Sequence, residues 1–129
     1  MPGKKNCTIR SIQDIVKASP LDVADWVNSM FIDKIPLSAD TIEELDTASR
    51  LMAKCTNQYS SLCGMMSFLK VYIRMAKNSG DKRLAEDLID KRDCLQWAME
   101  SVKLRISTLS RMITVKQEIN KELNMSRLD

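Results

Sequence analysis

Apolar side chains recur at spacings of three and four residues over a long central stretch, from Thr41 to Lys77. The members of this repeat are Leu45, Ala48, Met52, Cys55, Tyr59, Leu62, Met66, Leu69, Ile73 and Ala76. An unbroken heptad pattern of this kind places all ten side chains on one stripe of a single helix. We therefore predict a long helix over residues 39–78. Asp40 and Glu43 have the spacing of a capping box at its start, and Gly80 ends it. Gly64 lies inside the helix, where we expect it to permit close approach of a neighbouring helix.

A second apolar stripe predicts another long helix over residues 82–124. Its members are Leu84, Leu88, Leu95, Met99, Val102, Ile106, Leu109 and Ile113, and Arg92 interrupts it. Two helices of this length joined by a short turn predict an antiparallel hairpin. Asp87, Asp90 and Asp93 are interleaved with Lys91 and Arg92. This charge pattern indicates a salt-bridged surface rather than a metal site.

For the first 31 residues we predict a mobile N-terminal segment followed by two short helices. We expect residues 1–7 to be mobile and residues 8–31 to form the helices, the first capped by Thr8. The second begins with Ser19 as its cap and Pro20 as its first residue. Along it we expect a buried face, made up of Leu21, Val23 or Ala24, Trp26 and Val27. The 129 residues thus form one all-α domain. The hairpin and the short helices cannot cover every heptad position, so the pattern also predicts a coiled-coil contact between copies in a homo-oligomer.

Histidine and two common active-site motifs are absent from the sequence. The chain has no His, and its four cysteines, Cys7, Cys55, Cys63 and Cys94, form no CxxC pair, which argues against a zinc site. Neither a Gly-rich phosphate loop nor a GxSxG motif occurs. We therefore expect no enzyme activity and no cofactor. Cys55 and Cys63 should be small buried apolar groups. Without a signal peptide or a membrane-spanning apolar run, we expect a cytoplasmic protein with no membrane contact.

Positive charge is concentrated in one part of the chain. Residues 1–46 carry a net charge of −3, residues 47–80 carry +5 with no Asp or Glu, and residues 81–129 carry +1. A localised positive surface favours an acidic partner such as nucleic acid. The candidate nucleic-acid-binding residues are Lys70, Arg74, Lys77, Lys82, Arg83, Arg111 and Lys116. Tyr72 lies near these cations and could stack on a base, or it is a core or seam aromatic; Trp97 is interpreted as a core or seam aromatic. The alternative interpretation is a solvated helix face with no partner.

Three short segments resemble the UvsY family of phage recombination mediator proteins. Phe31-Ile32-Asp33 resembles a family segment ahead of the first long helix. The stretch at residues 57–62, Asn-Gln-Tyr-Ser-Ser-Leu, is similar to a family stretch that a Met follows four residues on, here Met66. The stretch at residues 110–116, Ser-Arg-Met-Ile-Thr-Val-Lys, followed by Ile119, resembles the family's Ser-Arg-Gly-Phe-x-Ile-Lys signature.

The resemblance spans residues 31–120 and has two departures. Met112-Ile113 replaces the family's Gly-aromatic pair. No Lys-x-Arg occurs at residues 78–80, where the family has its DNA-contacting pair, although Lys77, Lys82 and Arg83 flank this place. The resemblance implies a ring-like homo-oligomer that binds single-stranded DNA. It further implies loading of a RecA-type recombinase onto strands coated by single-strand binding protein.

Two other functions fit the same sequence. A small helical adaptor or phage inhibitor could bind a host protein by helix-in-groove contacts, with the acidic first 46 residues facing a basic target. A purely structural coiled-coil subunit is the third possibility.

Overall fold

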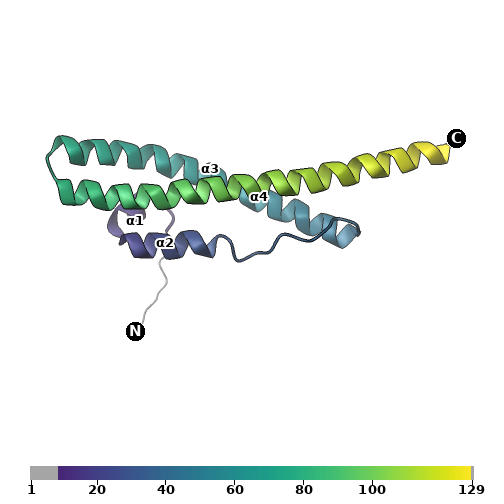
Figure 1. Ribbon diagram of the computed structural model, residues 1–129, viewed down its shortest axis with the longest axis horizontal. Coiled ribbons are helices and arrows are strands. Elements are labelled where there is room, and N and C mark those ends of the chain that lie inside the picture. Colours follow the sequence, from purple (N-terminus) through teal and green to yellow (C-terminus); the bar gives the residue numbers. More distant parts are fainter. Residues whose placement is uncertain (1–8, 129) are drawn as a thin grey trace, which may run out of the picture.

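The fold is an antiparallel hairpin of two long helices with two short helices against one side (Figure 1). It is seen in a computed structural model that describes residues 9–128, with side chains as far as Met125. The four helices are α1 (Ile12–Lys17), α2 (Pro20–Ser29), α3 (Ile42–Asn78) and α4 (Lys82–Leu128). This confirms the all-α hairpin with two short N-terminal helices. The predicted mobile segment, residues 1–7, and the predicted Thr8 cap lie outside the described residues.

The short helices begin at capping residues. Ser11 caps α1, and its hydroxyl accepts a hydrogen bond from the Asp14 N–H at 3.4 Å. The first helix therefore begins at Ile12. Ser19 caps α2 as predicted, and Pro20 is the first helical residue.

The buried face of α2 is narrower than the sequence suggested. Val23 and Val27 are buried, and Trp26 is half-buried. Leu21 was predicted to be buried but is exposed. It lies in the first turn of α2, on a side that no other described element covers.

α3 begins at Ile42, three residues after the predicted start at residue 39, and its cap lies one residue after the predicted Asp40. Thr41 is the cap, and its hydroxyl accepts a hydrogen bond from the Glu44 N–H at 3.0 Å. The Glu44 carboxylate in turn accepts from the Thr41 N–H at 3.1 Å and from the Ser38 hydroxyl at 3.0 Å. The reciprocal pair is thus Thr41 and Glu44, so the predicted pairing of Asp40 with Glu43 is wrong. These hydrogen bonds, chiefly the one from the Thr41 N–H, hold the pKa of Glu44 below its ordinary value.

The predicted stripe of α3 forms the core of the hairpin. Seven of its members are buried, namely Ala48, Cys55, Leu62, Met66, Leu69, Ile73 and Ala76. Leu45, Met52 and Tyr59 are half-buried, and Leu51 is a further buried residue that the pattern omitted. Cys63 is only half-buried. The expectation for Gly64 is wrong, because Gly64 is exposed and a Cβ there would meet nothing within 4 Å.

The turn between α3 and α4 is short and is closed by two backbone hydrogen bonds. Gly80 has a φ of 80°, which glycine adopts without strain, and this confirms it as the helix breaker. The Gly80 N–H donates to Lys77 O at 3.1 Å, and the Asp81 N–H donates to Ala76 O at 3.1 Å. These two bonds form a Schellman motif. Asp81 then begins α4, because its carboxylate accepts from the Leu84 N–H at 3.1 Å.

The seam and the end of α4 each differ from the prediction. Leu88, Leu95, Val102 and Leu109 are buried as expected, but Ala85 is buried in place of Leu84, which is exposed near the turn. The helix also continues to Leu128 instead of ending at 124. In Figure 1 its C-terminal end projects past the beginning of α3.

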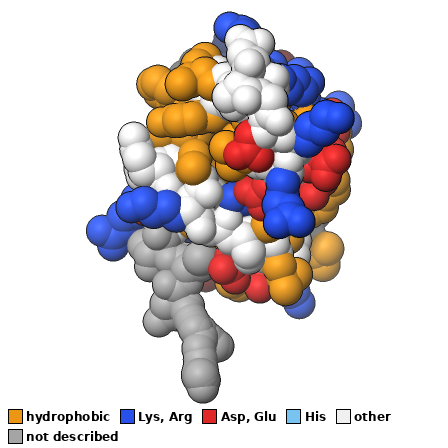
Figure 2. Space-filling model, turned by 90° about the vertical axis from the view of Figure 1, so that its left-hand side faces the viewer, with side chains coloured by type: hydrophobic (Ala, Val, Ile, Leu, Met, Phe, Trp, Pro, Cys, Tyr) orange, Lys and Arg blue, Asp and Glu red, His pale blue; other side chains and the backbone are white. Residues whose placement is uncertain are grey.

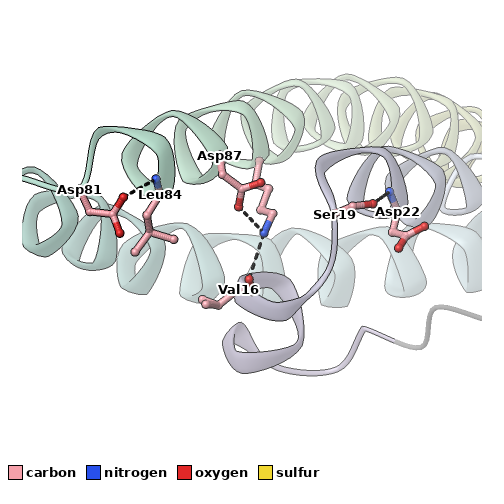
Figure 3. A network of polar contacts seen from close by, with 7 residues as sticks. Val16, Ser19, Asp22, Asp81, Leu84 and Asp87 are labelled. Atoms are coloured by element: carbon pink, nitrogen blue, oxygen red, sulfur yellow. Dashed lines mark hydrogen bonds and ion pairs between the residues drawn. The ribbon is translucent and has the colours of Figure 1, made fainter.

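The charged residue in the α4 seam is Lys91 and not Arg92. Its side chain is 1% exposed. The Lys91 ammonium lies 2.7 Å from Asp87 Oδ2 and donates to Val16 O at 3.1 Å (Figure 3). The prediction of a salt-bridged surface is therefore wrong for Lys91, since this side chain is buried and its hydrogen bond to Val16 joins α4 to the end of α1.

Candidate nucleic-acid interface

Five of the seven candidate residues lie at the turn end of the hairpin. Lys70, Arg74 and Lys77 belong to the last turns of α3, while Lys82 and Arg83 belong to the first turn of α4. All five are exposed. The Schellman turn brings the end of α3 and the start of α4 together, so it places these cations at one end of the molecule. We refer to these five residues as the turn cluster.

The turn cluster keeps its charge available to a ligand. Among the ion pairs of residues 9–125, none involves a member of the cluster. Asp81 and Glu86 are the acidic residues closest in sequence, so the stretch from Lys70 to Glu86 retains a net charge of +3. Figure 2 looks at this end of the molecule and shows Lys and Arg side chains at the top and right, with some Asp and Glu side chains between those on the right.

The two remaining candidates lie far from the turn cluster. Arg111 is 29 residues beyond Lys82 on the same helix, or about 43 Å at a rise of about 1.5 Å per residue. Arg111 and Lys116 border a shallow hollow of about 290 Å³, together with Ala39 and Asp40 from the segment before α3. The structure therefore does not join them to the turn cluster.

The other cations of α3 are already paired. Arg50 lies 3.0 Å from Asp46 one turn earlier, and Lys54 donates to the Asp33 carboxylate. The hydrogen bond from Lys54 lowers the pKa of Asp33 below its ordinary value. The uniformly basic exterior expected for α3 is thus confined to its C-terminal half.

The aromatic residues are arranged differently from the expectation. Tyr72 is half-buried and packs against the core. Trp97 is 51% exposed and packs edge-to-face on Phe31, with ring centroids 5.3 Å apart. The Arg105 guanidinium lies over the Phe31 ring, with its central carbon 5.5 Å from the ring centroid. The most exposed aromatic near the turn cluster is Phe68, which the heptad pattern passed over because it lies outside the seam.

The described residues contain no group of three or more His, Cys, Asp or Glu side chains that could hold a metal ion. None of the helices between residues 9 and 128 has the length and apolar character needed to span a lipid bilayer.

The arrangement can bind an extended anion at one end of an elongated molecule. Comparison of the chain with protein-family models, with curated proteins and with solved structures gave no match.

Proposed function

We propose that this protein is a single-stranded-DNA-binding recombination mediator that acts as a homo-oligomer and loads a RecA-type recombinase. The observation that carries the proposal is the turn cluster, whose five exposed cations have no acidic partner within residues 9–125. Phosphate neutralisation by Lys and Arg is the main source of sequence-independent binding to nucleic acid. The loading step rests on the resemblance to the UvsY family.

Oligomer formation would strengthen a weak site. Each subunit offers only five cations, and linking several copies raises the effective concentration of the unbound sites. Exposed apolar side chains on the C-terminal part of α4 support contacts between copies. These side chains are Val115, Ile119, Leu123 and Met125.

The test is fluorescence anisotropy with a labelled oligo-dT across a salt series. If all five cations contact phosphates, the slope of log affinity against log salt is about −3.5 per subunit, from about −0.7 per contact. The double variant Lys70→Ala/Arg74→Ala should reduce the slope to about −2.1. The control Lys103→Ala/Lys121→Ala removes the same charge from exposed positions elsewhere on α4 and should leave the slope unchanged. Absence of binding at about 50 mM salt would overturn the proposal.

A second candidate is a helical adaptor or phage inhibitor that binds a host protein. The same exposed apolar residues of α4 favour it, because a partner helix could cover them. Light scattering separates the two candidates. A monomer that forms a 1:1 complex with a host protein supports the adaptor, and a multimer that binds oligo-dT supports the mediator.

A further inference from the structure

Three large apolar side chains lie exposed along the last turns of α3. Phe68 is 60% exposed, Val71 45% and Met75 58%. Their spacings of three and four residues place them on one side of the helix. Neither α4 nor the short helices cover them. We call these three residues the apolar strip.

The apolar strip runs beside a row of cations on the same helix. Lys70, Arg74 and Lys77 also follow one another at spacings of four and three residues. Lys70 comes two residues after Phe68, which is about 200° around the helix axis, whereas Arg74 comes three residues after Val71 and lies only about 60° from it. The buried seam, with Leu69 and Ile73, occupies the side between them that faces α4. The solvent-facing surface of α3 is therefore divided lengthwise into a cationic half and an apolar half.

Figure 2 looks at the turn end of the molecule. Apolar side chains gather at the upper left, and Lys and Arg side chains lie at the top, at the right and, below the apolar group, at the left. In Figure 1, α3 is the upper helix at this end of the molecule.

We infer that this divided surface holds a single strand of nucleic acid with its phosphates on the cationic half and its bases on the apolar strip, where Phe68 stacks on a base. The inference rests on the proposed function and specifies how its ligand is recognised. A single strand has the same division, because its backbone is anionic and the faces of its unpaired bases are apolar. Both halves lie on one helix of about 10–12 Å diameter and meet along its length, so a strand that runs along α3 can contact both. A duplex cannot use the apolar strip, since its bases are stacked on one another.

Pairing of the strip with the same strip of a second copy is disfavoured. A symmetric contact of this kind is isologous, so each copy presents the same residues to the other. It would bring the Arg74 side chains of both copies, which lie at the edge of the strip, close to the contact, and juxtaposed like charges oppose association. A nucleic acid instead supplies negative charge where the cations lie.

The experiment compares two labelled oligonucleotides with equal numbers of phosphates, one oligo-dT and one of abasic deoxyribose units. The wild-type protein should bind oligo-dT about tenfold more tightly, within the range that base–aromatic stacking gives. Phe68→Ala should remove this preference and leave the affinity for the abasic strand unchanged. Phe68→Trp should retain the preference. The matched control Leu104→Ala truncates another exposed apolar side chain, on α4, and should keep it too.

The outcomes separate the inference from the proposed function. Equal affinity of the wild-type protein for both strands would overturn the inference while phosphate binding stands. So would a Phe68→Ala variant that binds both strands more weakly by the same factor, because a lost contact between subunits acts in that way. Light scattering on each variant shows whether the mass has changed. Absence of binding to either strand would overturn the proposed function, and the inference with it.

Discussion

At the scale of single residues, Lys91 explains how a short helix is held in place. Burial of an ammonium group is costly unless it is paired and hydrogen-bonded. Lys91 satisfies both conditions, with the carboxylate of Asp87 and the carbonyl of Val16. Val16 lies in the last turn of α1, where carbonyl groups lack partners within the helix and carry partial negative charge. A helix of six residues is marginal alone, so this contact contributes to its position on the hairpin.

Replacement of Lys91 should therefore destabilise the fold. Lys91→Met keeps the volume of the side chain but leaves the Val16 carbonyl and the Asp87 carboxylate without their donor. We expect the free energy of unfolding to fall by about 1–3 kcal/mol, as measured by urea denaturation. The matched control is Arg92→Met, because Arg92 is more exposed and its pair with Asp93 spans 3.3 Å at the surface. The control should change the free energy by less than about 1 kcal/mol. Equal losses for the two variants would contradict a special role for the buried pair.

At the scale of helices, the start or end of a helix was predictable where only one residue type suits the backbone conformation at that position. Gly80 adopts a positive φ, and Ser19-Pro20 combines a cap with a first-position proline. The start of α3 was harder, because Asp40 and Thr41 are both good caps with a Glu three residues later. Sequence spacing cannot choose between two adjacent capping boxes. The observed hydrogen bond from Ser38 to Glu44 reinforces the Thr41 pairing.

The Thr41 cap gives a prediction at this scale. Thr41→Ala removes the hydroxyl that accepts from the Glu44 N–H and should lower the free energy of unfolding by about 1 kcal/mol. Asp40→Ala is the control, and it should have an effect within about 0.5 kcal/mol. Urea denaturation of both variants decides between the two capping residues. A larger effect for Asp40→Ala would restore the pairing expected from the sequence.

Glu44, the other residue of this capping box, makes the stability of the fold depend on pH. The pKa of Glu44 is lower in the folded chain than its ordinary value of 4.5. Its contribution to stability is therefore present above that value and is lost as the pH falls through the lower folded pKa. Glu44→Gln removes this titration. Its urea midpoint should fall less than that of the wild-type protein between about pH 6 and pH 3, and an equal fall would contradict the contribution of Glu44.

The core faces show where sequence patterns stop being informative. The α3 stripe was predictable because its heptads are unbroken, and the structure buries most of them. In α4 the pattern favoured Leu84 and treated Arg92 as the interruption, whereas Ala85 and Lys91 are buried. The choice depends on the side of α4 that faces α3 and on the partner that α1 supplies. Neither is encoded in the local spacing of α4.

At the scale of the whole molecule, the hairpin decides which candidate residues lie together. It joins the five cations of the turn cluster across a short turn and leaves Arg111 and Lys116 far along α4. The sequence could identify all seven as basic, but only the helix lengths and the turn group them. Phe68 was missed because a seam analysis counts buried positions, whereas a binding surface is made from exposed ones.

The projecting end of α4 gives the last prediction. It extends past the beginning of α3 in Figure 1, and its apolar side chains Val115, Ile119, Leu123 and Met125 are exposed. In the proposed homo-oligomer these side chains contact another copy. Ile119→Ser/Leu123→Ser should then shift the mass measured by light scattering from multimer to monomer. Both residues are already exposed, and substitutions at exposed positions usually change stability little. Helix content measured by circular dichroism should therefore stay within about a few per cent of the wild-type value.

The same double variant links assembly to DNA binding. Loss of neighbouring copies removes avidity, so affinity for a long oligo-dT should fall by about a hundredfold. Affinity for an oligonucleotide short enough to contact one subunit should not change, because the turn cluster lies at the other end of the hairpin. The matched control is Leu21→Ser/Leu37→Ser, two exposed leucines outside α4. An unchanged mass for Ile119→Ser/Leu123→Ser would place the contacts between copies elsewhere, and a monomeric control variant would show that exposed leucines in general hold the multimer together.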